Sequence, residues 1–252
     1  MELLLRLGVR RLKIASPDIT NAPLLYQAAR TGLPIILSTG MSTLGEIESA
    51  LGVLAFGYLG LEQPSRDAFL EAYGSPAGRA AVGRLVTLLH CTTEYPAPLA
   101  EVNLRVMDAL RSAFGLPVGY SDHTPGITVA IAAAARGATV VEKHVTLDRN
   151  LPGPDHQSSV EPGELAAMVR AIREVELALG SDQKVVTPSE AKNRRVARKS
   201  LVAGRRITRG ECFTAENLGV KRPGGGLSPF EYWEWLGRVA ARDYEIDEVI
   251  AP

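Results

Sequence analysis

The sequence alternates short apolar runs with segments of helical periodicity, and this alternation constrains the fold more than any other feature. The apolar runs are rich in β-branched and aliphatic residues, and a helical pattern separates each run from the next. Such alternation is typical of parallel βα units. We therefore expect one parallel sheet covered by helices. Its predicted strands are residues 11–16, 34–39, 86–91, 117–122 and 139–145.

Local signals predict where several helices begin and end. Thr43 and Glu46 have the spacing of a capping box, which predicts a helix start after the second strand. Another helix is predicted to end at Gly180, with one apolar stripe packed against the sheet. The stripe consists of Leu165, Met168, Ile172, Val175 and Leu179.

The composition changes after Gly180, where the chain becomes polar and basic. A helix start at Thr187 lies within this segment. Further on, short strand and turn patterns precede a helix over 229–236 that is predicted to end at Gly237. The predicted organisation is a βα domain over 1–180, a linker over 181–195 and a small domain of mixed structure over 196–252.

The overall composition indicates a globular chain whose partner is a small molecule. Its 252 residues are 46% hydrophobic, and 28 basic side chains balance 28 acidic ones. A neutral chain with 6% aromatic residues lacks the basic, aromatic-rich surface of nucleic-acid-binding proteins. No apolar run is long enough to span a membrane, and the run at residues 1–11 is too short for a secretory signal. With Cys91 and Cys212 as its cysteines, we expect reduced thiols and a cytoplasmic location.

Two of the four histidines follow successive predicted strands, which places them at one edge of the sheet. Consecutive parallel strands lie about 4.8 Å apart with their carboxyl ends at the same edge, so His123 and His144 should face each other. Because side chains alternate along a strand, Glu142 shares the face of His144, and Ser121 shares that of His123. Facing imidazoles flanked by Glu142 and Asp122 predict a divalent metal site. The alternative is that each histidine only ends a strand and bonds a backbone carbonyl.

Other polar residues gather at the same predicted edge. Lys13 lies in an otherwise apolar strand, and Ser16 and Ser38 stand at strand ends. A lysine in a buried sheet requires a matching charge, and hydroxyls complement phosphate or carboxylate groups, so we expect an anionic substrate. The alternatives are a lysine that reaches solvent and serines that cap helices. His90, of opposite parity to Cys91, is interpreted as structural.

The chain carries six motifs in order: KIASPDITN, ILSTGM, LLHCTTEYP, GYSDHT, EKHVTLDRNLPGPDH and VKRPGGGLSP. Together they resemble the motifs of the sialic acid synthases, including their legionaminic acid relatives, over nearly the whole chain. The resemblance implies a (β/α)8 TIM-type barrel followed by a small antifreeze-like (SAF) domain. It also implies a domain-swapped homodimer in which each small domain covers the partner's site.

The resemblance further implies a reaction, the condensation of phosphoenolpyruvate with an N-acetylated hexosamine, with release of phosphate. The sugar would be N-acetylmannosamine or a 2,4-diacetamido relative. A divalent ion, manganese first and magnesium or cobalt as alternatives, is implied on His123 and His144. Glu142 and Asp18, the latter at a position where some members have glutamate, are implied to be catalytic. The implied substrate-binding residues are Lys13, Ser16 and Ser38 for phosphoenolpyruvate, Ser121 beside the metal, Thr93 where some members have an amide, Tyr95 and Asp155 for the sugar, and Arg222 for its N-acetyl group.

The chain departs from the family pattern in two respects. The family barrel has eight strands, whereas this sequence shows five, which correspond to the last five. We therefore expect an incomplete barrel, which comes from a truncated reading frame or is a fragment of a longer enzyme, with little synthase activity alone. Residues 52–85 are longer than the usual segment and are interpreted as a lid or surface elaboration. Two other functions remain open: a different metal-dependent barrel aldolase, and a non-catalytic sugar-binding remnant of a synthase.

Overall fold

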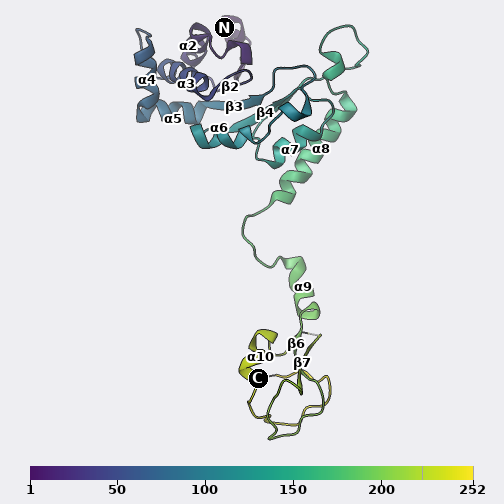
Figure 1. Cartoon of the computed structure of the whole chain (residues 1–252). Helices are drawn as coiled ribbons and strands as arrows, with labels where there is room; N and C mark the ends of the chain where they lie inside the picture. The colour runs from purple at the N-terminus through teal and green to yellow at the C-terminus, as the bar shows by residue number, and fades with distance from the viewer. Residues whose placement is uncertain (223, 252) are drawn as a thin grey trace. The chain divides into compact units, whose positions relative to one another are not determined.

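The computed structural model describes residues 1–222 and 224–251, in two compact units, Met1–Gly180 and Ser181–Pro252. Each unit has a hydrophobic core of its own. The first unit is a sheet with helices packed on it, and the second is a small domain preceded by a helix (Figure 1).

The first unit is built on five parallel strands in sequential order. The predicted strands are confirmed, although four of them are one to two residues shorter at one or both ends. The fifth ends early because Val145 pairs with Val160, so the chain changes its pairing partner at His144. A doubly wound sheet reverses its strand order at a switch point, so the sequential order indicates an arc of a βα barrel. The strands are β1 Leu12–Ile14, β2 Ile35–Ser38, β3 Val86–Cys91, β4 Val118–Asp122 and β5 Val141–Lys143.

A contact between the two edge strands shows that this sheet is strongly curled. Lys13 belongs to β1 and Glu142 to β5, yet Lys13 Nζ lies 3.4 Å from Glu142 Oε1. In a flat sheet, four spacings of about 4.8 Å would hold these strands about 19 Å apart. Two side chains of this length bridge such a gap only when the sheet bends towards them. The inner face is therefore concave, as in a barrel.

Helices flank the sheet, and local sequence signals place two of them correctly. Thr43 and Glu46 exchange hydrogen bonds through their side chains and backbone N–H groups, which confirms the predicted capping box. The helix predicted to end at Gly180 also ends there. The helices of this unit are α1 Glu2–Arg6, α2 Ala22–Arg30, α3 Leu44–Tyr58, α4 Arg66–Gly74, α5 Pro76–Leu85, α6 Val106–Phe114, α7 Thr128–Ala135 and α8 Pro162–Leu179, with 3-10 turns η1 Ser16–Asp18, η2 Leu99–Glu101 and η3 His156–Ser158.

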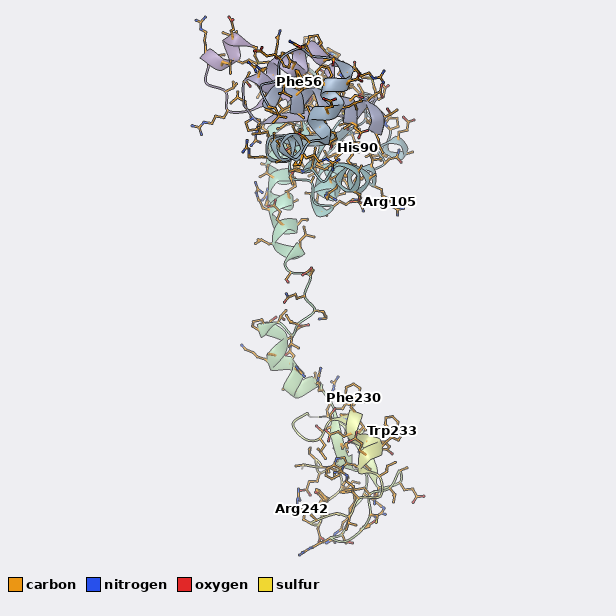
Figure 2. The ribbon with its side chains drawn as sticks, turned by 90° about the vertical axis from the view of Figure 1, so that its left-hand side faces the viewer. Phe56, His90, Arg105, Phe230, Trp233 and Arg242 are labelled. Carbon is orange, nitrogen blue, oxygen red and sulfur yellow. The ribbon has the colours of Figure 1, made fainter. Side chains whose placement is uncertain are left out.

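Residues 52–85 are part of the helical layer, which favours a surface elaboration over a lid. They include most of the second half of α3, where Leu54 and Phe56 are fully buried. Helices α4 and α5 pack beside α3 (Figure 1), and the rings of Phe56 and Phe69 meet edge to face with centroids 5.1 Å apart. A Cβ at Gly52 would lie 3.0 Å from the Phe69 carbonyl oxygen, so glycine permits this close approach of α4. Figure 2 shows Phe56 among the packed side chains of this unit.

The second unit joins one helix to a small β domain. Its first helix begins at a capping box of Thr187 and Glu190, as the sequence predicts, and overlaps the segment expected to be a linker. The helix expected over 229–236 divides into a 3-10 turn and a short α-helix. None of the helices in 1–222 and 224–251 combines the length and apolar character that crossing a membrane requires. The elements are α9 Pro188–Ala197, β6 Ser200–Ala203 and β7 Leu218–Lys221, which are antiparallel, η4 Pro229–Glu231 and α10 Tyr232–Trp235.

Candidate functional site

The two histidines meet at the carboxyl ends of β4 and β5. These strands pair in a register that ends one residue before His123 and His144. The ring centroids of the two histidines are 5.4 Å apart, with an angle of 78° between the ring planes. The Tyr95 ring lies against both, with its centroid 4.0 Å from that of His123 and 5.4 Å from that of His144. The structure therefore brings together three ring side chains from the ends of three successive strands.

Hydrogen bonding fixes the tautomer of His123. Its Nδ1 lies 2.8 Å from the Thr92 carbonyl oxygen, and because a carbonyl only accepts, Nδ1 carries the proton. The lone pair of Nε2 is left for another partner, as in metal-ligating histidines that a backbone carbonyl orients. Burial lowers the pKa of His123, and the neighbouring His144 lowers it further. The ring is therefore neutral near pH 7, which is the form that binds metal ions.

The two imidazoles would supply only part of the coordination shell of a divalent ion. Neutral imidazole is a common ligand of borderline divalent ions. Within the part of the chain that the structure describes, no group of three or more His, Cys, Asp or Glu side chains is placed to hold an ion. Two protein nitrogens leave coordination positions for water and substrate, and such open positions are typical of catalytic rather than structural ions.

Glu142 lies next to the histidines, and two polar side chains fix its carboxylate. Ser121 Oγ donates to Glu142 Oε1 at 2.7 Å, and Lys13 Nζ lies 3.4 Å from the same oxygen. The Lys13 and Glu142 side chains are 33% and 39% exposed, so a ligand in the concave face can reach both. The curled sheet thus joins an ammonium, a hydroxyl and a carboxylate from β1, β4 and β5.

Two buried hydroxyls at the strand ends have no partner among the described residues, namely Ser38 Oγ and Thr93 Oγ1. Next to them, Ser16 Oγ accepts from the Gly40 backbone N–H at 3.0 Å. A Cβ at Gly40 would collide with Thr93 Oγ1 and lie 2.8 Å from Ser16 Oγ, so Gly40 makes room for these hydroxyls. Because a buried hydroxyl without a partner is costly, this group indicates a polar ligand.

Asp122 does not flank the histidines on the inner face, which corrects the sequence interpretation. Its Oδ2 accepts from Lys143 Nζ at 2.8 Å on the outer face, where both side chains are almost fully buried. Side-chain alternation is the reason, because Asp122 and His123 are successive residues. His90 has the structural role expected of it, since its Nε2 donates to the Val102 carbonyl oxygen at 2.6 Å.

The remaining predicted residues lie in different parts of the chain. Asp155 Oδ2 is 3.9 Å from His144 Nδ1. Asp18 lies in η1, where it accepts from Asn21 Nδ2 at 3.3 Å and lines a groove together with Lys13. Arg222 directly follows β7 in the second unit and is exposed. Among the described contacts, the structure brings Asp155 but not Asp18 to the histidines.

Sequence reasoning missed two contributors to the site, Gly40 and Cys91. Cys91 Sγ lies 3.8 Å from His123 Nδ1, and burial raises the pKa of the thiol, which keeps it protonated. Gly40 ends the segment STG at a strand end, and glycine in that position is a signal of close approach. The Thr92 carbonyl had no sequence signal, because any residue supplies a carbonyl.

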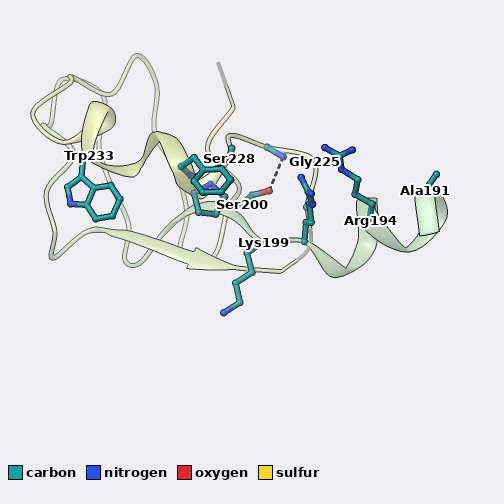
Figure 3. Close-up of a pocket in the computed structure, with 12 residues that line it drawn as sticks. Ala191, Arg194, Lys199, Ser200, Gly225, Ser228 and Trp233 are labelled. Atoms are coloured by element: carbon teal, nitrogen blue, oxygen red, sulfur yellow. Dashed lines mark hydrogen bonds between the residues drawn. The ribbon is translucent and has the colours of Figure 1, made fainter. Parts of the chain in front are cut away.

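The second unit carries a pocket of its own, with a volume of about 820 Å³ (Figure 3). Gly226 N–H donates to Ser200 Oγ at 3.1 Å in its wall. Phe230 and Trp233 are 91% and 76% exposed, and Figure 2 labels both on this unit. The lining also includes the basic side chains of Arg194, Arg198 and Lys199. This unit therefore presents a basic and aromatic surface next to its glycine-rich motif.

A parallel arc with a polar rim, followed by a small β domain, defines a barrel-type protein with a candidate ligand site at its strand ends. Two family matches identify which barrel-type protein this is. The NeuB family matches residues 1–184, and the SAF domain matches residues 198–252. The chain therefore belongs to the NeuB family and carries a SAF domain, which confirms the resemblance and the expected fold class.

Individual relatives support the same assignment. The N,N'-diacetyllegionaminic acid synthase of Campylobacter jejuni is 47% identical over 99% of this chain and 68% of its own length. The enzyme of the same name from Legionella pneumophila is 41% identical over 94% of this chain and 61% of its length. A crystal structure of N-acetylneuraminic acid (sialic acid) synthetase from Leptospira borgpetersenii, in complex with citrate, aligns with a TM-score of 0.61 and 36% identity, covering 76% of this chain and 59% of that one. The chain thus spans about three fifths to two thirds of these relatives.

Proposed function

We propose that the chain takes part in the condensation of phosphoenolpyruvate with an N-acetylated hexosamine, which gives a nonulosonic acid and phosphate. One observation carries the proposal: a single concave face holds the facing imidazoles of His123 and His144 and, beside them, the ammonium of Lys13 and the carboxylate of Glu142. The names of the two legionaminic acid synthases favour a 2,4-diacetamido hexosamine over N-acetylmannosamine as the sugar.

Phosphoenolpyruvate carries a phosphate and a carboxylate, and the rim offers groups that complement both. The Lys13 ammonium supplies positive charge, and its partial exposure allows it to exchange Glu142 for a ligand anion. Ser38 and Thr93 contribute hydroxyls that have no partner among the described residues. Ser16, which accepts from Gly40, still has its own proton to donate.

His123 and His144 would hold the divalent ion, and we place manganese first, with magnesium or cobalt as alternatives. When bound, the ion supplies Lewis-acid polarisation of the sugar aldehyde oxygen. His123 donates its Nδ1 proton to the Thr92 carbonyl oxygen, which leaves the lone pair of Nε2 free to bind the ion. Tyr95 packs against both rings and restricts their rotation.

In the proposed reaction, C3 of phosphoenolpyruvate bonds to the aldehyde carbon, water adds to C2, and phosphate leaves. Glu142 accepts a proton from that water, while Ser121 holds its carboxylate in place. The aldehyde oxygen becomes a hydroxyl by gaining a proton. Tyr95 and Asp155 contact the sugar, and Asp18 is a second catalytic carboxylate in addition to Glu142. Arg222 reaches the N-acetyl group from the other chain of a homodimer.

The proposed location is the cytoplasm. Cys91 and Cys212 are both free, as expected in a reducing compartment. The proposed partners are the small-molecule substrates and a second copy of the chain.

The test combines ligand binding with turnover. Phosphoenolpyruvate is titrated calorimetrically into the purified chain with Mn²⁺, and phosphate release is measured with a panel of N-acetylated hexosamines. We expect Lys13→Met to weaken phosphoenolpyruvate binding at least about tenfold, because a charge-assisted contact is lost. Lys192→Met, an exposed lysine of α9, is the matched control and should bind as the original chain does.

Different results would contradict the proposal. Formation of a condensation product without phosphate release would favour the aldolase alternative. Sugar binding that requires neither Mn²⁺ nor phosphoenolpyruvate would favour a non-catalytic binding protein.

A further inference from the structure

We propose that the buried ion pair of Lys143 and Asp122 is a positioning device that sets His123 and His144 opposite each other. The pair lies on the outer face of the sheet, one residue before each histidine. The inference rests on the proposed function, because it concerns the ion site on which that function depends. It assigns a role to two residues that touch neither the ion nor the substrates.

The Lys143 ammonium group links the two backbone segments that carry the histidines. Lys143 Nζ donates to Asp122 Oδ2 at 2.8 Å and also to the Thr124 carbonyl oxygen. Asp122 and Thr124 are the residues on either side of His123, and Lys143 directly precedes His144. The backbone of His123 is thus held at both of its neighbours by the residue adjacent to His144.

Asp122 closes this arrangement on the β4 side. Its Oδ1 accepts from the Thr124 backbone N–H at 2.9 Å and from Thr124 Oγ1 at 2.8 Å. Four hydrogen bonds therefore link Asp122, Thr124 and Lys143, and both carboxylate oxygens of Asp122 accept at least one of them. The exposed fractions of the Lys143 and Asp122 side chains are 2% and 0%, so water does not compete for these bonds.

The β4 and β5 ladder stops one residue before the two histidines. The β4 and β5 pairing ends at Asp122 and Lys143, and the next pairing of this chain segment is that of Val145 with Val160. Beyond it, the backbone of each histidine bonds a different segment: the His144 carbonyl accepts from the Val160 N–H at 2.9 Å, and the His123 carbonyl accepts from the Ala97 N–H at 3.0 Å. A buried ion pair is weak evidence for stability but well suited to fixing register, because breaking it leaves a buried charge unpaired. We infer that the pair extends the β4 and β5 register to the histidines.

The experiment compares the Lys143→Met variant with the unsubstituted chain. Two properties are measured in folded protein: nuclear Overhauser contacts between the rings of His123 and His144 without metal, and Mn²⁺ affinity by titration of the free-ion electron paramagnetic resonance signal. We expect the ring contacts to weaken or vanish and Mn²⁺ affinity to fall about tenfold to a hundredfold, the range typical of residues that orient metal ligands. Lys143→Arg should restore part of both.

The controls separate positioning from general loss of a salt bridge. Lys221→Met removes the exposed ion pair with Asp247 and should change neither property. If Lys143→Met does not fold, Asp122→Asn takes its place, because it removes the charge but keeps an oxygen that accepts from Thr124. We expect the same two losses from it.

The possible failures are distinguishable. A folded Lys143→Met or Asp122→Asn chain with unchanged ring contacts and Mn²⁺ affinity overturns the positioning role. If the original chain shows the ring contacts but binds no Mn²⁺, the ion of the proposed function is wrong, while loss of the contacts in the variants still supports positioning.

Discussion

At the scale of single residues, the site is defined by the atoms that remain free to bind a ligand. His123 donates from Nδ1 to a backbone carbonyl, and its Nε2 remains free to bind a ligand. Glu142 receives Ser121 and Lys13 on one oxygen, Oε1, which leaves Oε2 available. The sequence could predict the residue types, because they stand at strand ends. It could not predict which atom of each is free, because that depends on neighbours such as Thr92 that carry no signal.

The close packing around Gly40 gives a prediction at this scale. Gly40→Ala should weaken phosphoenolpyruvate binding at least about tenfold, because the new Cβ displaces Thr93 Oγ1 and crowds Ser16 Oγ, and overpacking of this kind costs about 1–3 kcal/mol. Calorimetric titration measures the change. Gly45→Ala is the matched control, since a Cβ there meets nothing within 4 Å. Equal binding by both variants would show that these hydroxyls are not part of the site.

At the scale of elements, the sequence predicts features that depend on neighbouring residues, but not those that depend on long-range contacts. The capping box at Thr43 and the helix start at Thr187 each depend on residues within four positions of sequence, and the structure confirms both predictions. The packing of α4 and α5 on α3 depends on contacts such as Phe56 with Phe69, which no periodicity reveals. The contact of Lys13 with Glu142 requires the curvature of the whole sheet, so strand patterns alone could not show it.

A turn of the second unit has a stability that should depend on pH. Arg205, the Thr208 backbone N–H and Asn217 all donate to the Glu211 carboxylate, and the Arg205 hydrogen bond is the largest cause that lowers its pKa, to about 2. A carboxyl whose pKa is lower in the folded state stabilises the fold above its unfolded value of 4.5. That contribution is lost as the pH falls from 4.5 to about 2.

Glu211→Gln should therefore lower the Tm of the second unit at pH 6, and the difference from the original chain should shrink as the pH falls towards 2. Thermal unfolding followed by circular dichroism at several pH values measures this. The exposed Glu216 provides a control, and Glu216→Gln should leave the Tm nearly unchanged. A Glu211→Gln effect that persists undiminished at pH 2 would assign it to something other than the carboxylate charge.

At the scale of the whole molecule, the residues that the structure describes form two hydrophobic cores rather than one. The first includes Leu88 of β3, and the second includes Phe213, whose ring contacts those of Trp235 and Tyr244. The family matches also end and begin between these cores, at residues 184 and 198. Because apolar burial is the main favourable term in folding, separate cores predict separate cooperative units.

Differential scanning calorimetry should therefore resolve two unfolding transitions, and core substitutions should act on one each. Phe213→Ala is expected to destabilise the second unit by about 3–5 kcal/mol, and Leu88→Ala the first by about 2–5 kcal/mol, because each removes a fully buried side chain and leaves a cavity. Each substitution serves as the control for the other. If Phe213→Ala lowered both transitions equally, the two cores would have to unfold as one unit, and the stability of the ligand site on the first unit would then depend on the second.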